Sequence, residues 1–258
     1  MAGKCTNVLL ALFLSLLFAL SPQKLTHAEQ VTFKGPPIEP SAFKKKKAKA
    51  QGIELKAAPG REITGYLFKP AGAGKSSTAV ILSSIHGINK SHLAWAELLK
   101  AQGLASLVVD GKTTNPEEVL HFLGAQDFVD QHKLLLMGFS VGGRKALKAL
   151  QKQDQGMFRA GIIFYANCDP SKKMTAPALV LLGGKDAFVS VEKCRELAAD
   201  ENLSLVVYEE ATHFFDDPAY RRNKSVTEKP PLFDNNHYDP EAHVDALARV
   251  RGFLERQF

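Results

Sequence analysis

The chain has 258 residues, of which 45% are hydrophobic, and it carries a formal net charge of +6 at pH 7. This length fits one α/β domain behind a short leader and leaves little room for a second domain. The densest positive charge is a lysine run at residues 44–47, which has neither interleaved aromatic residues nor a nucleic-acid-binding motif. We therefore expect no nucleic-acid partner.

The first 28 residues have the pattern of a secretory signal peptide. Lys4 supplies the positive end, residues 8–20 form an apolar core, and Thr26-His27-Ala28 resembles a cleavage site. The apolar core is shorter than the roughly 20 residues that a membrane-spanning helix needs. We expect a cleaved leader, a periplasmic or secreted protein, and no stable insertion into a membrane.

Residues 29–51 combine the lysine run with several prolines, so we predict a basic, proline-rich N-terminal arm in solvent. Residues 52–258 are predicted to form the folded domain. Its strands are predicted at residues 53–57, 63–68, 79–84, 105–109, 134–137, 160–165, 178–182 and 203–208. Its helices are predicted to begin near Ser91, Asn115, Arg144, Ser190 and Asp239.

The first two of these strands, separated by Pro59-Gly60, are predicted to form an antiparallel pair. From residue 79 onward strands and helices alternate, which predicts a mostly parallel central sheet flanked by helices on both faces. No insertion between these strands is long enough to form a lid domain.

Residues 138–143, Gly-Phe-Ser-Val-Gly-Gly, follow a continuous apolar run and precede a helix-forming segment. A serine between two glycines at such a strand–turn–helix junction is typical of a nucleophile elbow, where Cβ atoms would clash and the hydroxyl stands above the sheet edge. Ser140 is the candidate nucleophile. The alternative is an ordinary structural turn, because Gly and Ser are common in turns.

Two further residues follow strand ends in the order that α/β-hydrolases use. Asp186 comes after the strand at 178–182, and His213 after the strand at 203–208. His213 would act as general base and then acid, while Asp186 would orient the imidazole and stabilise its charged form. Singly, Asp186 could cap the helix at Ser190 and His213 could be a loop residue; their joint placement favours the triad.

The oxyanion would need two backbone N–H donors, one of them from Val141, the residue after the nucleophile. The second is expected from the loop after the strand at 79–84, where Ile85 and Ile88 are the alternatives and His86 would shape the site. His92, His121 and His132 are interpreted as surface or packing residues, and His237 and His243 flank the last helix. No pair has metal-ligand spacing, so we expect no metal and no cofactor.

Two cysteines remain after leader cleavage, Cys168 and Cys194. An even pair in an oxidising compartment favours a disulfide. The alternative is that Cys194 is a buried thiol, since it shares a helical stripe with Leu197 and Ala198.

From about Gly52 to the C-terminus the chain resembles the dienelactone hydrolase family of α/β-hydrolases, particularly its exported members. The resemblance lies in residues 138–143, 181–186, 208–216 and 238–242, and in the contexts of the two cysteines. It implies the α/β-hydrolase fold and supports the disulfide.

Two positions depart from the family pattern. Ser140 stands where true dienelactone hydrolases have cysteine, and Ser84 stands where they have glutamate. The alignment of residues 84–89 with the family's Glu-Ile-Phe-Gly-Val-Asn points to Ile85 as the second oxyanion donor. These changes argue against dienelactone itself as the substrate.

We therefore expect an exported serine hydrolase that cleaves a small ester, lactone or thioester through an acyl-enzyme, with Ser84, His86 and Phe188 lining the substrate pocket. Its partner would be a small ester-like molecule. Two alternatives stay open, a non-catalytic exported binding protein on a hydrolase scaffold and a peptidase of the same superfamily. The sequence specifies neither the natural substrate nor the oligomeric state.

Overall fold

The structure is a computed structural model, and it describes residues 28–37, 60–72, 74–152, 156–221 and 236–258. Three features discussed from the sequence lie outside these residues: the signal peptide up to residue 27, the lysine run at 44–47, and the strand at 53–57.

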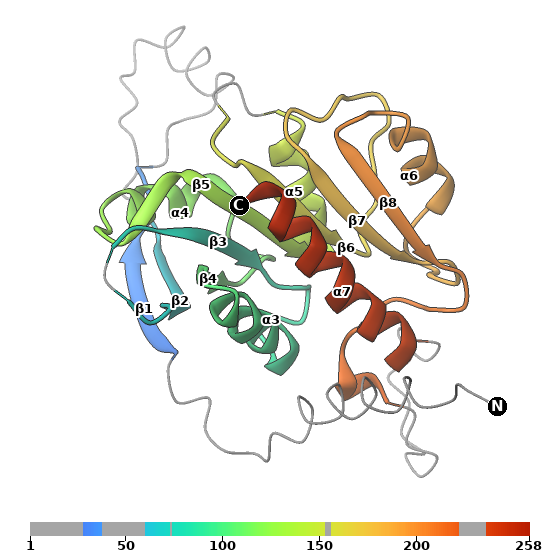
Figure 1. Cartoon of the computed structure of the whole chain (residues 1–258), viewed down its shortest axis with the longest axis horizontal. Coiled ribbons are helices and arrows are strands. Elements are labelled where there is room, and N and C mark those ends of the chain that lie inside the picture. Colours follow the sequence, from blue (N-terminus) through green and yellow to red (C-terminus); the bar gives the residue numbers. More distant parts are fainter. Residues whose placement is uncertain (1–27, 38–59, 73, 153–155, 222–235) are drawn as a thin grey trace, which may run out of the picture.

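The described residues contain one eight-stranded sheet, in the order β1-β2-β4-β3-β5-β6-β7-β8 (Figure 1). The strands are β1 (Glu29–Lys34), β2 (Glu62–Phe68), β3 (Ser76–Leu82), β4 (Ala105–Val109), β5 (Val129–Phe139), β6 (Ala160–Phe164), β7 (Ala178–Gly183) and β8 (Leu203–Tyr208). The β1–β2 and β2–β4 pairs are antiparallel and the other neighbouring pairs are parallel. The mostly parallel sheet predicted from the sequence is confirmed.

Helices cover both faces of this sheet. One face packs against α3 (Lys90–Ala101) and α7 (Pro240–Gln257), which lie in front in Figure 1. The opposite face packs against α4 (Pro116–Gly124), α5 (Val141–Leu150) and α6 (Val191–Leu197). A short 3-10 helix, η1 (Pro218–Tyr220), follows the last strand.

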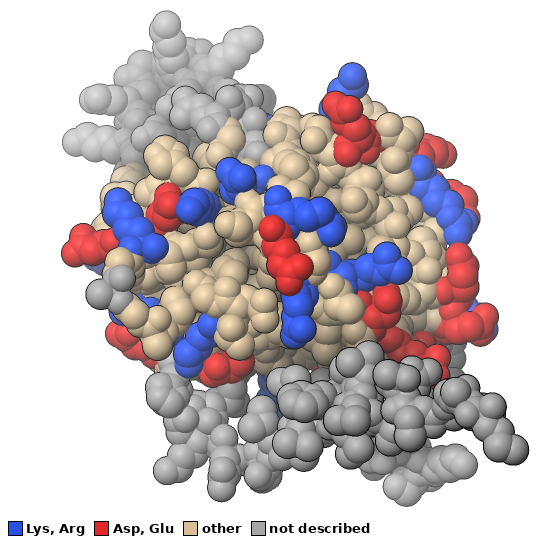
Figure 2. Space-filling model, viewed as in Figure 1, with Lys and Arg blue, Asp and Glu red and all other residues tan. Residues whose placement is uncertain are grey.

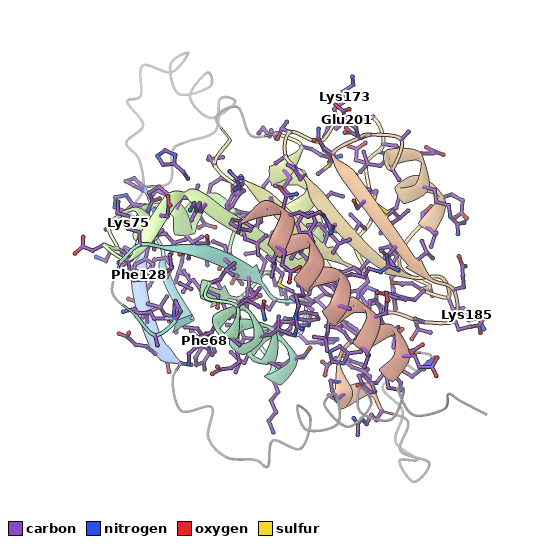
Figure 3. All side chains as sticks on the ribbon, in the orientation of Figure 1. Phe68, Lys75, Phe128, Lys173, Lys185 and Glu201 are labelled. Atoms are coloured by element: carbon purple, nitrogen blue, oxygen red, sulfur yellow. A yellow bond between two sulfur atoms is a disulfide. The ribbon has the colours of Figure 1, made fainter. Side chains whose placement is uncertain are left out.

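The central strands are buried on both faces, which explains their sequences. Every residue of β4 and of β6 is buried. A strand between two helical layers has no water-facing side, so it reads as a continuous apolar run rather than an alternating one. Figure 3 shows side chains filling the space between sheet and helices, while Lys173, Lys185 and Glu201 lie at the rim.

The first strand was not predicted. Residues 29–34, which the sequence assigned to the N-terminal arm, form β1 and pair with β2 from Glu29↔Leu67 to Lys34↔Glu62. Alternation explains this strand: Val31 and Phe33 pack against the core, and the Phe33 ring stacks on Phe122 with the centroids 4.3 Å apart. The prolines that suggested an arm come only after the strand has ended.

On the face shown in Figure 2, lysine and arginine side chains lie among aspartate and glutamate side chains. On α7, for example, Arg249 pairs with Asp245 one turn away at 3.1 Å. Within the described residues, no helix is both long enough and apolar enough to cross a membrane.

The parallel strands bring their carboxyl ends to one edge of the sheet. The segments that follow β3, β5, β6, β7 and β8 therefore meet there. This edge is where an open parallel sheet places its functional side chains.

Candidate active site

Ser140 occupies a strained turn between β5 and α5. β5 ends at Phe139, α5 begins at Val141, and Ser140 between them has φ 52° and ψ −112°. A positive φ is costly for a residue with a Cβ atom, and such strain persists only where the surroundings enforce it. The geometry is that of the predicted elbow.

The glycines beside Ser140 are required by close backbone approach. A Cβ atom on Gly138 would lie 2.6 Å from the carbonyl oxygen of Gly142, and one on Gly142 would lie 2.5 Å from the carbonyl oxygen of Ser83. Real Cβ atoms essentially never come so close to other atoms. The turn therefore admits no side chain at either position, as the sequence suggested.

Ser140, His213 and Asp186 come together in one hydrogen-bonded chain. The Ser140 Oγ atom lies 2.9 Å from His213 Nε2, and His213 Nδ1 lies 2.6 Å from Asp186 Oδ2. The second carboxylate oxygen of Asp186 accepts from the backbone N–H of Phe188 at 2.8 Å. All groups are satisfied when Nδ1–H donates to Asp186 and Nε2 accepts from the serine hydroxyl. This arrangement can move the serine proton to the imidazole.

Aromatic rings enclose the imidazole of His213. The ring centroids of Phe214, Tyr165 and Phe188 lie 4.4, 4.6 and 5.3 Å from that of His213. The histidine side chain is almost fully buried, and that of Asp186 is completely so. The packing limits the imidazole to a small range of orientations.

Asp216, three residues after His213, is a buried carboxylate that was not identified as a site residue from the sequence. Asp216 Oδ1 accepts from the Tyr165 hydroxyl at 2.9 Å, and Oδ2 accepts from Trp95 Nε1 at 2.7 Å and from the Ser91 hydroxyl at 3.5 Å. Burial raises the pKa of Asp216 to about 6, although the bonds to Trp95 and Tyr165 oppose the rise. Asp216 thus ties the loop of His213 to α3 and to the end of β6.

The loop after β3, residues 84–89, forms a tight turn. The Ser84 carbonyl accepts from the N–H of Gly87 at 3.1 Å. Because the N–H and C=O of a trans peptide point in opposite directions, the N–H of Ile85 points away from Gly87. Val141 is the first residue of α5, so its N–H has no acceptor within that helix. The assignment of Val141 and Ile85 as the oxyanion donors stays a prediction.

The predicted pocket residues divide into two kinds. Ser84 is buried. His86 is exposed, with its ring 5.7 Å from that of Phe214, and Phe188 is 41% exposed beside His213. The side chain of Ile85 is likewise 46% exposed, whereas Ile88 packs against the core. His86 and Phe188 therefore adjoin the ring cluster around His213.

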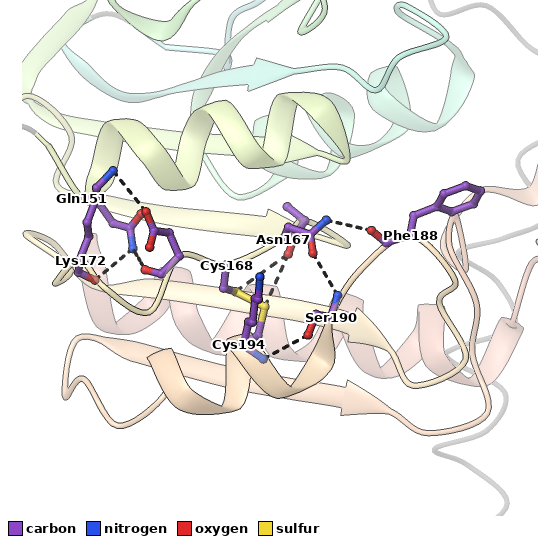
Figure 4. Close-up of a disulfide and its surroundings, with 10 residues drawn as sticks. Gln151, Asn167, Cys168, Lys172, Phe188, Ser190 and Cys194 are labelled. Atoms are coloured by element: carbon purple, nitrogen blue, oxygen red, sulfur yellow. Dashed lines mark hydrogen bonds and ion pairs between the residues drawn. A yellow bond between two sulfur atoms is a disulfide. The ribbon is translucent and has the colours of Figure 1, made fainter.

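The predicted disulfide is present between Cys168 and Cys194, whose Cα atoms are 5.0 Å apart (Figure 4). It joins the segment after β6 to α6. The neighbouring Asn167 donates from Nδ2 to the Phe188 carbonyl at 2.8 Å and accepts at Oδ1 from the Ser190 N–H at 3.0 Å. The disulfide-linked segment therefore braces the loop that carries Asp186 and Phe188.

His92 has a polar environment that the sequence did not reveal. It is buried on α3, and its ring nitrogens face the backbone N–H groups of Ser84 and Asn89 at 3.2 and 3.1 Å. Burial lowers the pKa of His92 to about 4.

The other two histidines interpreted as surface or packing residues, His121 and His132, are exposed. Among the described residues, no group of three or more His, Cys, Asp or Glu could hold a metal ion.

The fold and the site together define an α/β-hydrolase: a mostly parallel sheet carries a serine on the turn after β5, an acid after β7 and a histidine after β8. More specifically, the chain belongs to the dienelactone hydrolase family, whose family model matches residues 112–258. Comparison with curated proteins found no match.

Solved structures share the fold at low sequence identity. A dienelactone hydrolase-like promiscuous phosphotriesterase from metagenomic libraries is 18% identical, covers 89% of this chain and 99% of its own, and has a TM-score of 0.65. The protein m3DLH is 19% identical, with coverage of 90% and 99% and a TM-score of 0.65. Esterase 2 of Thermogutta terrifontis, phosphonylated by cyclosarin, is 16% identical, with coverage of 76% and 89% and a TM-score of 0.56. The predicted α/β-hydrolase fold is confirmed.

Proposed function

We propose that the protein is a serine hydrolase that cleaves ester, lactone or thioester bonds of small molecules through an acyl-enzyme. The observation that carries this proposal is the chain of hydrogen bonds from Ser140 through His213 to Asp186, at 2.9 and 2.6 Å. A serine hydroxyl is a weak nucleophile unless a base takes its proton during attack, and a neutral imidazole at this distance is such a base.

The reaction would proceed in two halves. Ser140 Oγ attacks the carbonyl carbon while its proton passes to His213 Nε2, and Asp186 stabilises the imidazolium that results. The N–H groups of Val141 and Ile85 would bind the negative oxygen of the tetrahedral intermediate. The imidazolium then protonates the leaving group. A water molecule, activated by the same imidazole, releases the acid and restores the serine.

The surroundings of the triad favour substrates with an apolar portion. Ile85 and Phe188 are large hydrophobic side chains that stay 46% and 41% exposed, and the Phe188 ring contacts the base His213. Exposed apolar side chains gathered near reactive groups are typical of a binding surface. Small neutral esters therefore fit the site better than highly charged ones.

A fluorophosphonate probe, which forms a covalent bond with an activated serine, tests the proposal. We expect labelling of the wild type and none of Ser140→Ala. Ser171→Ala is a suitable control, because Ser171 lies on the exposed segment after the disulfide cysteine Cys168. Equal labelling of wild type and Ser140→Ala would refute the assignment.

The alternative of a non-catalytic binding protein has less support. Such a protein would have no need to keep a serine at φ 52° hydrogen-bonded to a histidine that is in turn hydrogen-bonded to a buried aspartate. Hydrolysis of short p-nitrophenyl esters that disappears in His213→Ala would favour the enzyme. Binding of these esters without turnover would favour the alternative.

We further propose that the protein is exported and cleaved after Ala28. Two observations support export: the signal pattern of the first 28 residues, and a disulfide, which persists mainly in oxidising compartments. Cleavage there would leave β1, which begins at Glu29, intact. N-terminal sequencing of the mature protein should show Glu29 as its first residue. A chain that keeps Met1 and stays in the reducing cytosol would contradict export.

A further inference from the structure

His92 is a buried histidine that the proposed reaction does not use. It is the third residue of α3 and follows the N-cap residue Asn89 by three positions. Burial lowers the pKa of its imidazole to about 4, so the ring is neutral near pH 7. A neutral imidazole has one protonated nitrogen and one acceptor nitrogen.

The two ring nitrogens face the two ends of the 84–89 loop. The N–H of Ser84 points at Nε2 at 3.2 Å, and the N–H of Asn89 points at Nδ1 at 3.1 Å. One acceptor nitrogen can serve only one of these donors. The Ser84 contact is buried, whereas the Asn89 contact is only partly buried. Since an unbonded amide costs most where water cannot reach it, the tautomer that accepts at Nε2 is favoured.

This bond holds the peptide group that directly precedes the one containing the N–H of Ile85. The Ser84 carbonyl is held by the Gly87 N–H at 3.1 Å, and the Ser84 N–H is held by His92. Both peptide groups of Ser84 are therefore fixed, and the direction of the Ile85 N–H follows from them.

The same imidazole also contacts the nucleophile strand. Its ring lies edge-on to that of Phe139, with the centroids 4.9 Å apart and the planes at 84°. Phe139 is the last residue of β5 and directly precedes Ser140. One rigid ring thus touches both the 84–89 loop and the base of the elbow.

We infer that His92 is a positioning residue: by accepting the Ser84 N–H through Nε2 and packing on Phe139, it sets the N–H of Ile85 relative to Ser140. This inference rests on the proposed serine hydrolase function, in which Ile85 supplies one of the oxyanion donors. The competing account is that His92 only caps α3 by accepting from the N–H of Asn89.

His92→Gln separates the two accounts. A glutamine at the third helical position accepts the N-cap N–H in a capping box, so the helix cap is kept. Its single amide oxygen cannot also hold Ser84. We expect the variant to melt near the wild-type temperature, with KM little changed and kcat per fluorophosphonate-titrated site lowered about 10- to 100-fold. Removing an oxyanion donor outright costs about 100- to 1000-fold.

Dividing the rate by the number of fluorophosphonate-labelled sites keeps the kinetic test free of folding effects. Unfolded molecules are not labelled, so a partly unfolded sample has fewer titrated sites but the same kcat per site. His132→Gln, at an exposed histidine of β5, is the matched control and should behave as wild type. An unchanged kcat per site in His92→Gln would overturn the positioning role while leaving the serine hydrolase intact. A wild type that neither labels nor turns over esters would overturn the hydrolase proposal and this inference with it.

A second measurement needs no variant. Nitrogen NMR of the ¹⁵N-histidine-labelled wild type near pH 7 distinguishes a protonated ring nitrogen from an acceptor nitrogen. We expect the resonances of His92 to show Nδ1 protonated and Nε2 as acceptor. The reverse tautomer would mean that the ring holds the helix cap rather than Ser84, and would overturn the inference.

Discussion

The hydroxyl of Tyr165 donates to the carboxylate of Asp216 at 2.9 Å, and the ring of the same tyrosine lies 4.6 Å from the imidazole of His213. One buried aspartate thus supports the aromatic side chain against which the base packs. Asp216 belongs to the histidine's own loop, so its bond to Tyr165 joins that loop to the end of β6.

The pKa of Asp216 makes a prediction about stability and pH. Burial raises it from 3.8 to about 6. A raised pKa in the folded state means that the group's contribution to stability is fully present below pH 3.8 and is lost as the pH rises through 6. Because the rise is about two units, the loss is roughly 3 kcal/mol.

Asp216→Asn, which does not titrate, should lack this dependence. The free energy of unfolding of wild type minus that of the variant should fall by roughly 2 to 2.5 kcal/mol between pH 4 and pH 7, because part of the full change already lies below pH 4. Urea unfolding at pH 4, 5, 6 and 7 measures both proteins. A difference that stays constant would show that the pKa of Asp216 has its ordinary value, and a difference that grows with pH would show that folding lowers this pKa; either result would contradict the prediction.

Asp186→Asn tests the orientation of the base. The carboxylate accepts from His213 Nδ1 at 2.6 Å, whereas an amide NH₂ at that position favours the tautomer with the proton on Nε2, facing Ser140. We expect kcat on p-nitrophenyl acetate to fall about 10⁴-fold, with the folded structure kept. Asp169→Asn, at a half-buried aspartate outside the triad, is the control. A fall below tenfold would mean that Asp186 does not set the tautomer.

The elbow and its partners were predictable because local features carry them. Glycine spacing, a strand before Ser140 and a helix after it determine the turn, and the parallel strands bring Asp186 and His213 to the same edge. The disulfide followed from an even pair of cysteines and from the family resemblance.

Asp216 and His92 were not predictable as site components, because distant contacts give them their environments. The partners of Asp216 lie at Ser91, Trp95 and Tyr165, and His92 meets Ser84 across a turn. The hydrophobic periodicity of a sequence does not show which polar side chains are buried by such distant contacts. β1 was missed for a different reason, since the prolines and lysines that follow it dominated the composition of residues 29–51.

The disulfide should contribute stability that exceeds that of the hydrogen bonds beside it. Cys168 and Cys194 are 26 residues apart, and closing a loop of that size stabilises the folded state by roughly 3 kcal/mol. The double variant Cys168→Ala/Cys194→Ala should lose about that much in urea unfolding. Asn167→Ala, which keeps the disulfide, should lose only about 1 to 2 kcal/mol. Equal losses would show that the disulfide adds nothing beyond the neighbouring hydrogen bonds.

Gly142 links the elbow to the segment that leads into the 84–89 loop, and its substitution should disturb both. A Cβ atom there would lie 2.5 Å from the Ser83 carbonyl oxygen, a backbone atom that cannot rotate away. Gly142→Ala should lower the free energy of unfolding by about 1 to 3 kcal/mol, as overpacking does. It should also lower kcat, because relieving the clash moves Ser83 or the helix that begins after Ser140.

Gly124→Ala is the matched control: its Cβ would meet nothing within 4 Å, so the change should be neutral or stabilise by up to about 1 kcal/mol. Urea unfolding and esterase rates compare the two variants, and a Gly142→Ala protein as stable and active as Gly124→Ala would show that the turn has more room than the structure allows.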